Sequence, residues 1–273
     1  MDFLIEMIVS SARRAEAARA AHPLLPPENP GRARRLRAAL AAPAEAARQA
    51  GLPEPLALIA EVKRRSPSKG DIAPGLDAAE QAIAYEKAGA DAISVLTEPS
   101  RFGGSMDDLR AVTAAVGIPV IRKDFIVDPY QVWEAADAGA AAVLLIAAAL
   151  PSGSLGKLLD ECHDCGLDAL VEIHDPDDLE RAYAVGASMM GVNNRDLHTL
   201  EVDLAVSEQL GALMGRCVLF VSESGIHSPG DAQRVRAAGA QAILVGEALV
   251  STPREHLADA VAALRNVPAA EAG

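Results

Sequence analysis

The segment KAGADAISV, residues 87–95, is the first of five similar phrases that recur along the chain. The others are DAGAAAVLL from Asp137, CGLDALVEI from Cys165, VGASMMGV from Val185 and AAGAQAILV from Ala237. In each phrase a glycine stands where a helix would end, because glycine readily adopts the left-handed conformation of a helix C-terminus. The alanine, valine, isoleucine and leucine run that follows is apolar on both faces, as in a buried parallel strand. Each phrase therefore predicts the end of one helix and the start of the next strand.

Eight strands are expected once the segments that lack this phrase are added. They are residues 56–63, 91–97, 119–125, 141–148, 168–173, 188–194, 218–224 and 242–247. Their first residues lie between 20 and 35 positions apart, which leaves room for one helix and two short loops in each interval. Eight such units predict an α/β protein with a closed (β/α)8 TIM barrel. An open, doubly wound parallel sheet is the alternative fold.

The barrel needs only part of the 273 residues. We expect the catalytic barrel to occupy residues 51–267 and residues 268–273 to form a frayed tail of small and polar residues. Residues 1–50 are expected to form an N-terminal helical extension that packs on the barrel.

Two helices are expected in this extension, over residues 1–20 and 31–50, separated by the helix-breaking segment HPLLPPENP. An apolar stripe on the first helix predicts docking, and its members are Phe3, Leu4, Met7 and Ile8. Since the bottom of such a barrel is expected to be sealed already, we place part of the extension near the mouth. There it would contact the loops after the first, second and eighth strands.

Composition and charge restrict the possible partners. Lysine and arginine number 25 against 38 aspartate and glutamate residues, so the net charge is −13, which opposes binding to nucleic acid or an anionic membrane. The longest wholly apolar run, residues 140–150, is shorter than the roughly 20 residues that cross a bilayer. Asp2 and Glu6 stand where a signal peptide would carry basic residues. We therefore expect a cytoplasmic monomer or weak homodimer without nucleic-acid or membrane partners.

The three cysteines do not indicate a metal or disulfide site. Cys162 and Cys165 form a CxxC motif, but no second ligand pair follows at the spacing that a structural zinc site needs. We expect no metal.

Charged and polar residues gather at the carboxyl ends of the expected strands. The first strand ends in AEVKRRSPSKG, which puts Glu61 and Lys63 on one strand face and Ser66 in the following loop. Later strand ends add Lys123, Glu172, Asn193, Arg195, Glu223 and Ser224. Active sites of such barrels lie at this end, and burying several charges there is costly unless they pair. The pattern predicts acid–base chemistry at the mouth of the barrel.

Two glycine loops near the end of the chain predict an anion site. SGI follows the seventh strand and VGEAL follows the eighth. Backbone N–H groups near Gly225 and Gly246 can approach an anion, and these two loops form the usual phosphate site of a barrel. With Arg195 and Lys63 as nearby cations, we expect a small phosphorylated substrate.

Six motifs together resemble the indole-3-glycerol phosphate synthase family. In chain order they are IAEVKRRSPSKG, SVLTEPSRFGGS, IRKDFIVDPYQ, LVEIHD, GVNNRDL and VSESGI. The resemblance implies a carboxy-lyase of tryptophan biosynthesis that closes the indole ring of 1-(2-carboxyphenylamino)-1-deoxyribulose 5-phosphate. Carbon dioxide and water are released, and the resemblance implies no cofactor or metal.

The resemblance also implies roles for individual residues. Lys123 would protonate the substrate carbonyl as the ring attacks it. Glu172 and Lys63, with Glu61 beside them, would be the acids and bases of the later steps, in an order that the sequence leaves open.

Substrate-binding residues follow from the same resemblance. Asn193 and Glu223 resemble the substrate-binding pair of the family. The expected phosphate site contains Lys63, Ser66, Arg195, Ser224, Gly225, Gly246 and Glu247. Leu96, Phe102 and Phe125 would face the aromatic ring.

Two positions depart from the pattern of the family. Arg101 stands where many relatives have an aromatic residue, which would thin the apolar wall over the ring. Glu247 stands beside Gly246 where several relatives have serine. A carboxylate would repel a phosphate, so we expect Glu247 to turn away and to leave only its backbone N–H at the site.

Two other functions compete with this one. A barrel aldolase would use Lys63 or Lys123 as a Schiff-base amine, which needs a lysine of lowered pKa, whereas neighbouring glutamates favour the ammonium form. A non-catalytic barrel that binds a phosphorylated metabolite or a partner enzyme is the third possibility, and the complete set of Lys123, Glu172 and Lys63 argues against it.

Overall fold

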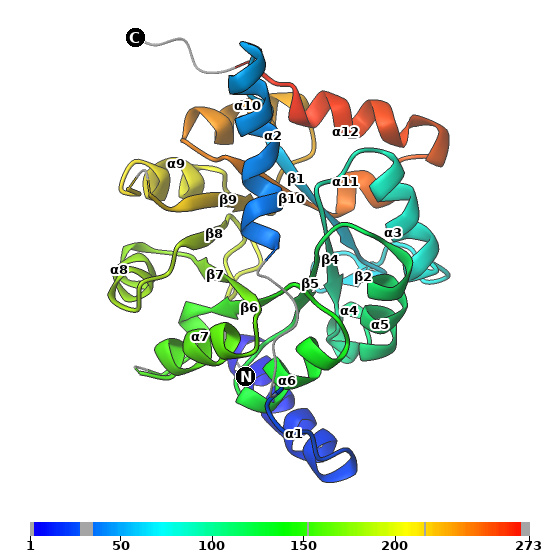
Figure 1. Ribbon diagram of the computed structural model, residues 1–273, viewed down its shortest axis with the longest axis vertical. Coiled ribbons are helices and arrows are strands. Elements are labelled where there is room, and N and C mark those ends of the chain that lie inside the picture. The colour runs from blue at the N-terminus through cyan, green and yellow to red at the C-terminus, as the bar shows by residue number, and fades with distance from the viewer. Residues whose placement is uncertain (1–2, 28–34, 152, 216, 269–273) are drawn as a thin grey trace.

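A closed barrel of eight parallel strands forms the centre of the molecule (Figure 1). The computed structural model describes residues 3–27, 35–151, 153–215 and 217–268. Around the barrel the strand order is β1-β10-β9-β8-β7-β6-β5-β4, and β4 pairs with β1 to close the ring. The predicted (β/α)8 TIM barrel is confirmed, and the open sheet is excluded.

The strands agree with the expected ones to within two residues at each end. They are β1 (Ala57–Val62), β4 (Ala92–Leu96), β5 (Val120–Lys123), β6 (Ala142–Ile146), β7 (Asp168–Ile173), β8 (Met189–Asn193), β9 (Leu219–Glu223) and β10 (Ala242–Val245). The loop after β1 also contains a short hairpin of β2 (Arg65–Ser66) and β3 (Gly70–Asp71).

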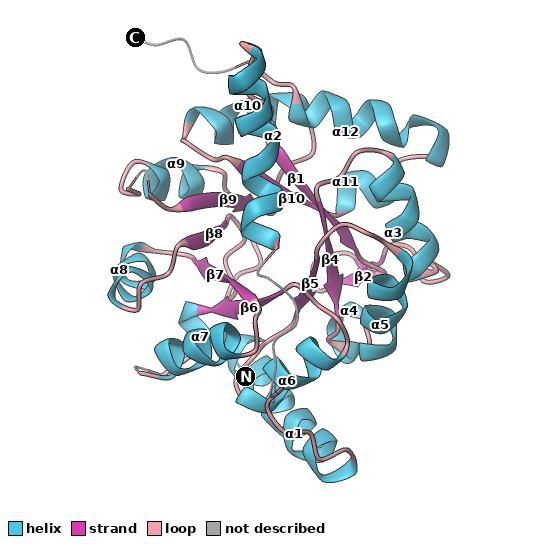
Figure 2. Cartoon of the chain, in the orientation of Figure 1, coloured by secondary structure: helices cyan, strands magenta, loops and turns pink. Residues whose placement is uncertain are grey.

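Helices alternate with the strands and cover the outside of the barrel (Figure 2). They are α3 (Ala78–Lys87), α4 (Pro99–Phe102), α5 (Met106–Ala115), α6 (Pro129–Asp137), η1 (Ala147–Ala149), α7 (Ser154–Asp164), α8 (Pro176–Ala184), α9 (Ala205–Gly211), α10 (Pro229–Ala237), α11 (Glu247–Val250), η2 (Arg254–His256) and α12 (Leu257–Arg265). The glycine of each repeated phrase has a positive φ, between +71° at Gly166 and +98° at Gly239. The sequence repeat therefore corresponds to helix ends, as predicted.

Alternation along the strands gives the barrel two separate apolar layers. On β1, Leu58 and Ala60 belong to the outer layer that packs against the helices, whereas Ala57 and Ile59 belong to the inner layer that fills the barrel. The inner layer fills the barrel below its mouth and so supports the side chains at the carboxyl ends of the strands.

The second helix of the extension closes the bottom of the barrel, at the amino ends of the strands. α2 (Leu36–Ala50) buries Leu36 and Leu40 against the inner layer. The backbone N–H of Arg37 donates to Oδ2 of Asp168, the first residue of β7, at 3.1 Å. The expectation that the bottom would be sealed already is wrong, because the small inner side chains Ala57 and Ala242 leave apolar surface that the leucines cover.

The first helix of the extension, α1 (Phe3–Ala21), lies beside the mouth, as expected. Among the described residues, its ion pairs and main contacts are with the loops after the second, third and fourth strands of the barrel, whereas the first, second and eighth were expected. The reason is charge complementarity: Glu6 pairs with Arg101 after β4, and Arg19 pairs with Asp128 after β5.

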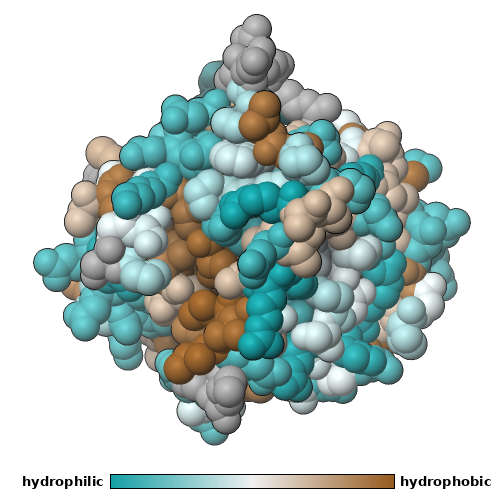
Figure 3. Space-filling model, turned by 90° about the horizontal axis from the view of Figure 1, so that it is seen from below, coloured by the Kyte–Doolittle hydropathy of each residue, from teal (hydrophilic) through white to brown (hydrophobic). Residues whose placement is uncertain are grey.

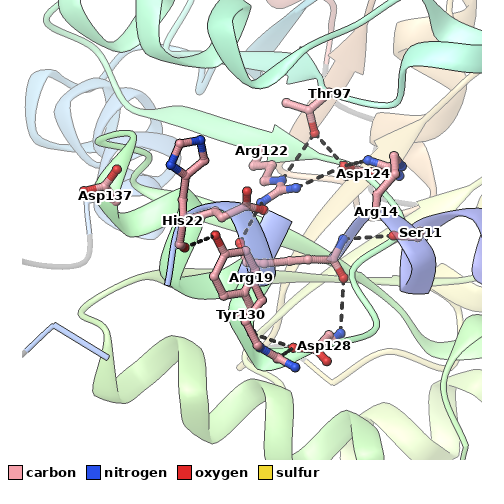
Figure 4. A network of polar contacts seen from close by, with 12 residues as sticks. Ser11, Arg14, Arg19, His22, Thr97, Arg122, Asp124, Asp128, Tyr130 and Asp137 are labelled. Atoms are coloured by element: carbon pink, nitrogen blue, oxygen red, sulfur yellow. Dashed lines mark hydrogen bonds and ion pairs between the residues drawn. The ribbon is translucent and has the colours of Figure 1, made fainter. Parts of the chain in front are cut away.

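A buried polar network joins α1 to the end of β5 (Figure 4). The Arg14 guanidinium donates two hydrogen bonds to Asp124, at 3.0 and 2.7 Å. Asp124 also accepts from Thr97 at 2.7 Å and from Arg122 at 3.2 Å. Burial alone would raise the pKa of Asp124, but Arg14, Arg122 and Thr97 lower it to about 2. The network therefore fixes the residues on both sides of Lys123.

Some expectations lie outside the described residues. These are positions 1–2 and 31–34 of the two expected helices and positions 269–273 of the expected tail. The division of the chain into an extension of residues 1–50 and a barrel of residues 51–267 stays a prediction.

The face seen from below carries a hydrophobic patch left of and below its centre, among largely hydrophilic surroundings (Figure 3). α1 lies at this lower edge in Figure 1, and its Ile5 and Val9 are exposed.

Within the described ranges, no helix combines the length and hydrophobicity needed to cross a membrane.

Candidate active site

One pocket opens at the carboxyl ends of the barrel strands, and every site residue predicted from the sequence lines it. These residues are Glu61, Lys63, Ser66, Leu96, Phe102, Lys123, Phe125, Glu172, Asn193, Arg195, Glu223, Ser224, Gly225, Gly246 and Glu247. The structure thus brings all of them together. Their roles toward a substrate stay predictions.

The strands position the charged side chains by the alternation that also fills the barrel. The inner-layer members two positions before Glu61, Lys123, Glu172 and Glu223 are Ile59, Ile121, Leu170 and Val221. Each of these strands therefore carries one ionisable residue above its apolar ones, at the end where the pocket opens.

Lys123 lies between two buried carboxylates. Its Nζ is 3.7 Å from Oε2 of Glu172 and 3.7 Å from Oε2 of Glu223. The lysine side chain is 17% exposed, and each glutamate side chain is 1% exposed. Neither oxygen of Glu223 has a hydrogen-bond partner in the part of the chain that the structure describes. The carboxylate therefore stays free to bind a ligand.

This arrangement separates the protonation states of the three groups. Burial lowers the pKa of Lys123, but Glu172, Glu223 and the more distant Glu61 raise it above its usual value. Burial raises the pKa of Glu172, but the Lys123 ammonium and further hydrogen-bond donors lower it well below its usual range. Burial also raises the pKa of Glu223, and Lys123 offsets this only in part, so the pKa rises to about 8. Lys123 and its neighbours therefore favour the ionised form of Glu172, whereas burial and the other glutamates favour the protonated form of Glu223.

Asn193 is fixed between two partners at the end of β8. Its Nδ2 donates to Oε1 of Glu172 at 3.1 Å, and its Oδ1 accepts from the backbone N–H of Arg195 at 3.0 Å. The amide therefore orients the Glu172 carboxylate and also fixes the start of the loop that carries Arg195.

A second ion pair lies on the β1 side of the pocket, where Lys63 pairs with Glu61. Glu61 also packs against Gly246, at which an added Cβ would lie 2.7 Å from its Oε1. Only glycine leaves room there for the carboxylate of Glu61.

Backbone conformation at the end of β9 suits an anion site. Ser224 has φ +63°, a left-handed conformation that is uncommon for a residue with a side chain and that concentrates at functional sites. Gly225 follows with φ +80°, and an added Cβ there would lie 2.6 Å from Val202. Ser66 also lines the pocket, from the loop after β1.

Arg195 supplies positive charge beside these loops. Its Nη1 donates to the carbonyl oxygen of Leu200 at 2.8 Å, and no ion pair to it is found among the described residues. Burial lowers its pKa, and the carboxylates of Glu247 and Glu61 raise it only partly back. A partly buried guanidinium with free donors is well suited to bind a phosphate.

Glu247 lines the pocket, and the expectation that its side chain turns away from a bound phosphate stays a prediction. Lys69 from the loop after β1 binds the Glu247 carboxylate. Burial would raise the pKa of Glu247, but Lys69 lowers it. The Lys69 ammonium therefore offsets part of the repulsion that a bound phosphate would meet.

Aromatic rings cover one side of the pocket. The Phe125 ring lies 6.4 Å from Phe102 and 6.2 Å from Phe3, measured between ring centroids. Phe3 comes from α1 and adds an aromatic ring to this side of the pocket. Less apolar surface was expected here, because Arg101 stands where many relatives have an aromatic residue. Arg101 instead donates to Glu6 of α1, at 2.7 and 2.9 Å. Arg101 thus helps to hold α1, the helix that contributes the Phe3 ring to the pocket.

Several lining residues were not predicted from the sequence. They are Phe3, Pro67, Glu98, Asp124, Leu144, Ile146, Leu197, Leu200, Ile226, His227, Leu244 and Val245. Leu144 and Ile146 could have been found, because they alternate on β6 as the charged residues do on other strands. Phe3 was recognised only as part of an apolar stripe, and nothing in the sequence places that stripe against Phe125.

A metal site is not apparent in the described part of the chain, which contains no group of three His, Cys, Asp or Glu side chains arranged to bind an ion. Cys162 and Cys165 are both buried in the outer apolar layer. Burial, with Glu161 nearby, raises the pKa of Cys165 to about 12, so this thiol stays protonated.

Gly191 on β8 was not among the site residues predicted from the sequence, yet it leaves the space that Glu223 occupies. An added Cβ would lie 2.0 Å from Oε1 of Glu223 and 3.4 Å from Leu170. The absent side chain provides the space in which the Glu223 carboxylate lies beside Lys123.

Comparison with known proteins gives one family. The family model described as indole-3-glycerol phosphate synthase matches residues 14–264. An indole-3-glycerol phosphate synthase of Beutenbergia cavernae is 52% identical over 210 residues, which cover 76% of this chain and 78% of the relative. The enzyme of the same name from Paenarthrobacter aurescens is 49% identical over 234 residues, 83% of this chain and 86% of the relative.

Solved structures support the fold. A crystal structure of a 4-hydroxy-2-oxoglutarate aldolase superimposes with a TM-score of 0.56 over 76% of this chain and 92% of that one. Since the two sequences are only 20% identical, this likeness shows a shared barrel fold and nothing about the reaction.

The contact at Gly191 predicts that Gly191→Ala displaces the Glu223 carboxylate and lowers kcat by about 10- to 100-fold for the activity after which the relatives are named. The matched control is Gly230→Ala on α10, where an added Cβ has its nearest neighbour at 3.6 Å and should leave kcat unchanged. A Gly191→Ala protein with wild-type kcat would show that the position of Glu223 does not matter to turnover.

Proposed function

This chain belongs to the indole-3-glycerol phosphate synthase family, and on that premise we propose how its pocket performs the reaction. The enzyme is a carbon–carbon lyase of tryptophan biosynthesis. It closes the indole ring of 1-(2-carboxyphenylamino)-1-deoxyribulose 5-phosphate and releases carbon dioxide and water. The division of labour among the pocket residues is the proposal.

The substrate has two dissimilar ends, and the pocket offers a matching site for each. The phosphate binds at the loops of Ser224, Gly225 and Gly246, with Arg195 and Lys63 as its cations and Ser66 as a hydroxyl donor. The aromatic ring packs against Leu96, Phe102 and Phe125. Holding both ends brings the ring carbon close to the C2′ carbonyl, and such proximity contributes roughly 7 to 11 kcal/mol to a ring closure.

The observation that carries the proposal is the Lys123 ammonium held between Glu172 and Glu223. When the ring carbon attacks C2′, negative charge develops on the carbonyl oxygen, and Lys123 donates a proton to it. The carboxylate then leaves as carbon dioxide, and its electron pair restores the aromatic ring. A general acid of this kind contributes about 10² to 10⁴ in rate.

Elimination of water needs an acid at the C2′ hydroxyl and a base at the C1′ carbon. Glu172 is the ionised carboxylate of the pocket and takes the proton from C1′. Lys63, paired with Glu61, donates a proton to the departing hydroxyl. Asn193 and the carboxylic acid of Glu223 bind the substrate by hydrogen bonds.

The aldolase alternative has no observation in its favour. A Schiff base requires a neutral lysine amine, whereas the carboxylates around Lys123 raise its pKa and favour the ammonium. We further propose that the protein acts in the cytoplasm as a monomer or weak homodimer. It needs no metal, cofactor, nucleic acid or membrane for this reaction.

Lys123→Met tests the central assignment. We expect kcat to fall by about 10² or more, because the proton donor at C2′ is lost. Turnover is followed by the indole fluorescence of the product, and binding of inorganic phosphate should stay within about twofold of wild type. Lys157→Met, at an exposed position of α7, is the control. If Lys123→Met keeps more than about a tenth of wild-type kcat, another group is the acid.

Arg195→Ala tests the phosphate site separately. We expect KM to rise at least about tenfold with a much smaller change in kcat, because a contact to a remote phosphate is made equally in the ground and transition states. Arg110→Ala, on the outer side of α5, should change neither constant. Equal losses in kcat and in kcat/KM would place Arg195 in the chemistry instead.

A further inference from the structure

His174 lies outside the proposed machinery but directly beside it. It is the first residue after β7, and its Nε2 is 3.3 Å from Oε1 of Glu172. On the other side its Nδ1 is 3.6 Å from Oδ2 of Asp178. The imidazole is 15% exposed and, among the described residues, is not part of the pocket lining. It therefore contacts the Glu172 carboxylate from behind and does not reach the substrate.

Asp178 is itself held in place at the first turn of α8. Its Oδ2 accepts from the backbone N–H of His174 at 3.2 Å, and its own N–H donates to Oδ1 of Asp175 at 2.8 Å. Arg181 lies 3.5 Å from its other oxygen. The imidazole thus lies between two carboxylates at ion-pair distance, although neither ring nitrogen meets hydrogen-bond geometry with a described residue.

The two glutamates beside Lys123 differ in their surroundings. Glu172 faces Lys123 from β5, Asn193 from β8 and His174 from its own chain segment. Glu223 faces Lys123 alone at ion-pair distance, and the charges of Glu172 and Glu61 act against its ionisation. Among the described titratable groups, Lys123 lies at ion-pair distance from both glutamates, whereas His174 lies at that distance from Glu172 only.

We propose that His174 is a positioning residue, whose imidazole lies between Asp178 and Glu172 and favours the ionised form of Glu172 over that of Glu223. The proposal rests on the proposed function, in which Glu172 acts as a base. A residue outside the pocket would then influence which of the two carboxyl groups beside Lys123 is ionised.

The charge of His174 follows from its surroundings. Burial would lower its pKa, but Asp178 and Glu172 raise it to about 10. The ring is therefore protonated throughout the neutral range, so His174 acts as a fixed cation and not as a pH switch.

Removing this cation predicts a specific change in the pH dependence of kcat. Because a positive charge 3.3 Å away lowers the pKa of Glu172, its loss raises that pKa, and Glu172 becomes protonated at higher pH. The two carboxylates would then share one proton. Since Glu172 must be ionised to act, kcat should fall at low pH in the variant but recover at higher pH.

The experiment compares His174→Gln with wild type by measuring kcat and KM for the carboxyphenylamino substrate between pH 5 and pH 9. We expect the acid limb of kcat to move to higher pH by about one unit or more, with KM within about twofold of wild type. Using kcat avoids titration of the free substrate phosphate. Asp178→Asn, which keeps the imidazole but lowers its pKa, should move the limb in the same direction by less. His256→Gln, at an exposed position of η2, is the control.

Each outcome decides between the proposals. A uniform loss of kcat at every pH, with the limb unmoved in both variants, would make His174 merely structural and overturn the inference. A rise of KM in proportion to the loss of kcat would place it in substrate binding and overturn it as well. Glu172→Gln is measured alongside: if that variant keeps wild-type kcat, the proposed role of Glu172 fails, whatever His174 does.

Discussion

The Lys123 ammonium, buried between Glu172 and Glu223, is the interaction on which the rest of the site depends. Removing three ionisable groups from water costs several kcal/mol per ion unless they pair and are hydrogen-bonded. Much of the surrounding structure supplies that compensation. Asn193 and His174 stabilise the charge on Glu172, and Gly191 provides the space for Glu223. Burial and the other two glutamates favour the protonated form of Glu223, so the two carboxyl groups beside Lys123 differ in their tendency to ionise.

The buried position of Lys123 also explains why α1 is packed against the mouth of the barrel. Lys123 can occupy its position only if the backbone around it is rigid, and Asp124 is fixed by Arg14 of α1 on one side and by Thr97 on the other. The backbone oxygen of Lys123 also accepts from Thr97 N–H at 3.1 Å. α1 therefore both contributes Phe3 to the aromatic wall and holds the strand end that carries the lysine.

Local sequence features were enough to predict the barrel and the charged and polar residues at its mouth, but not the whole lining of the pocket. The glycine before each apolar run marks a helix end, and alternation on a parallel strand fixes which residues meet at the mouth. Long-range features could not be predicted in this way. The position of α2 depends on how much space Ala57 and Ala242 leave inside the barrel. The contacts of His174 with Glu172 and Asp178 are local in the sequence, but they depend on the geometry of the turn from β7 into α8. Protonation states depend on burial and on distances between strands, which a single sequence does not contain.

The central claim is that one proton resides on Glu223 while Glu172 is ionised and Lys123 is charged. Neutron diffraction from deuterated crystals near neutral pD observes these protons directly. The account predicts three deuterons on Lys123 Nζ, one on each ring nitrogen of His174, one on the Glu223 carboxyl group and none on Glu172. A deuteron on Glu172 with a bare Glu223, or a neutral Lys123 amine, would contradict it.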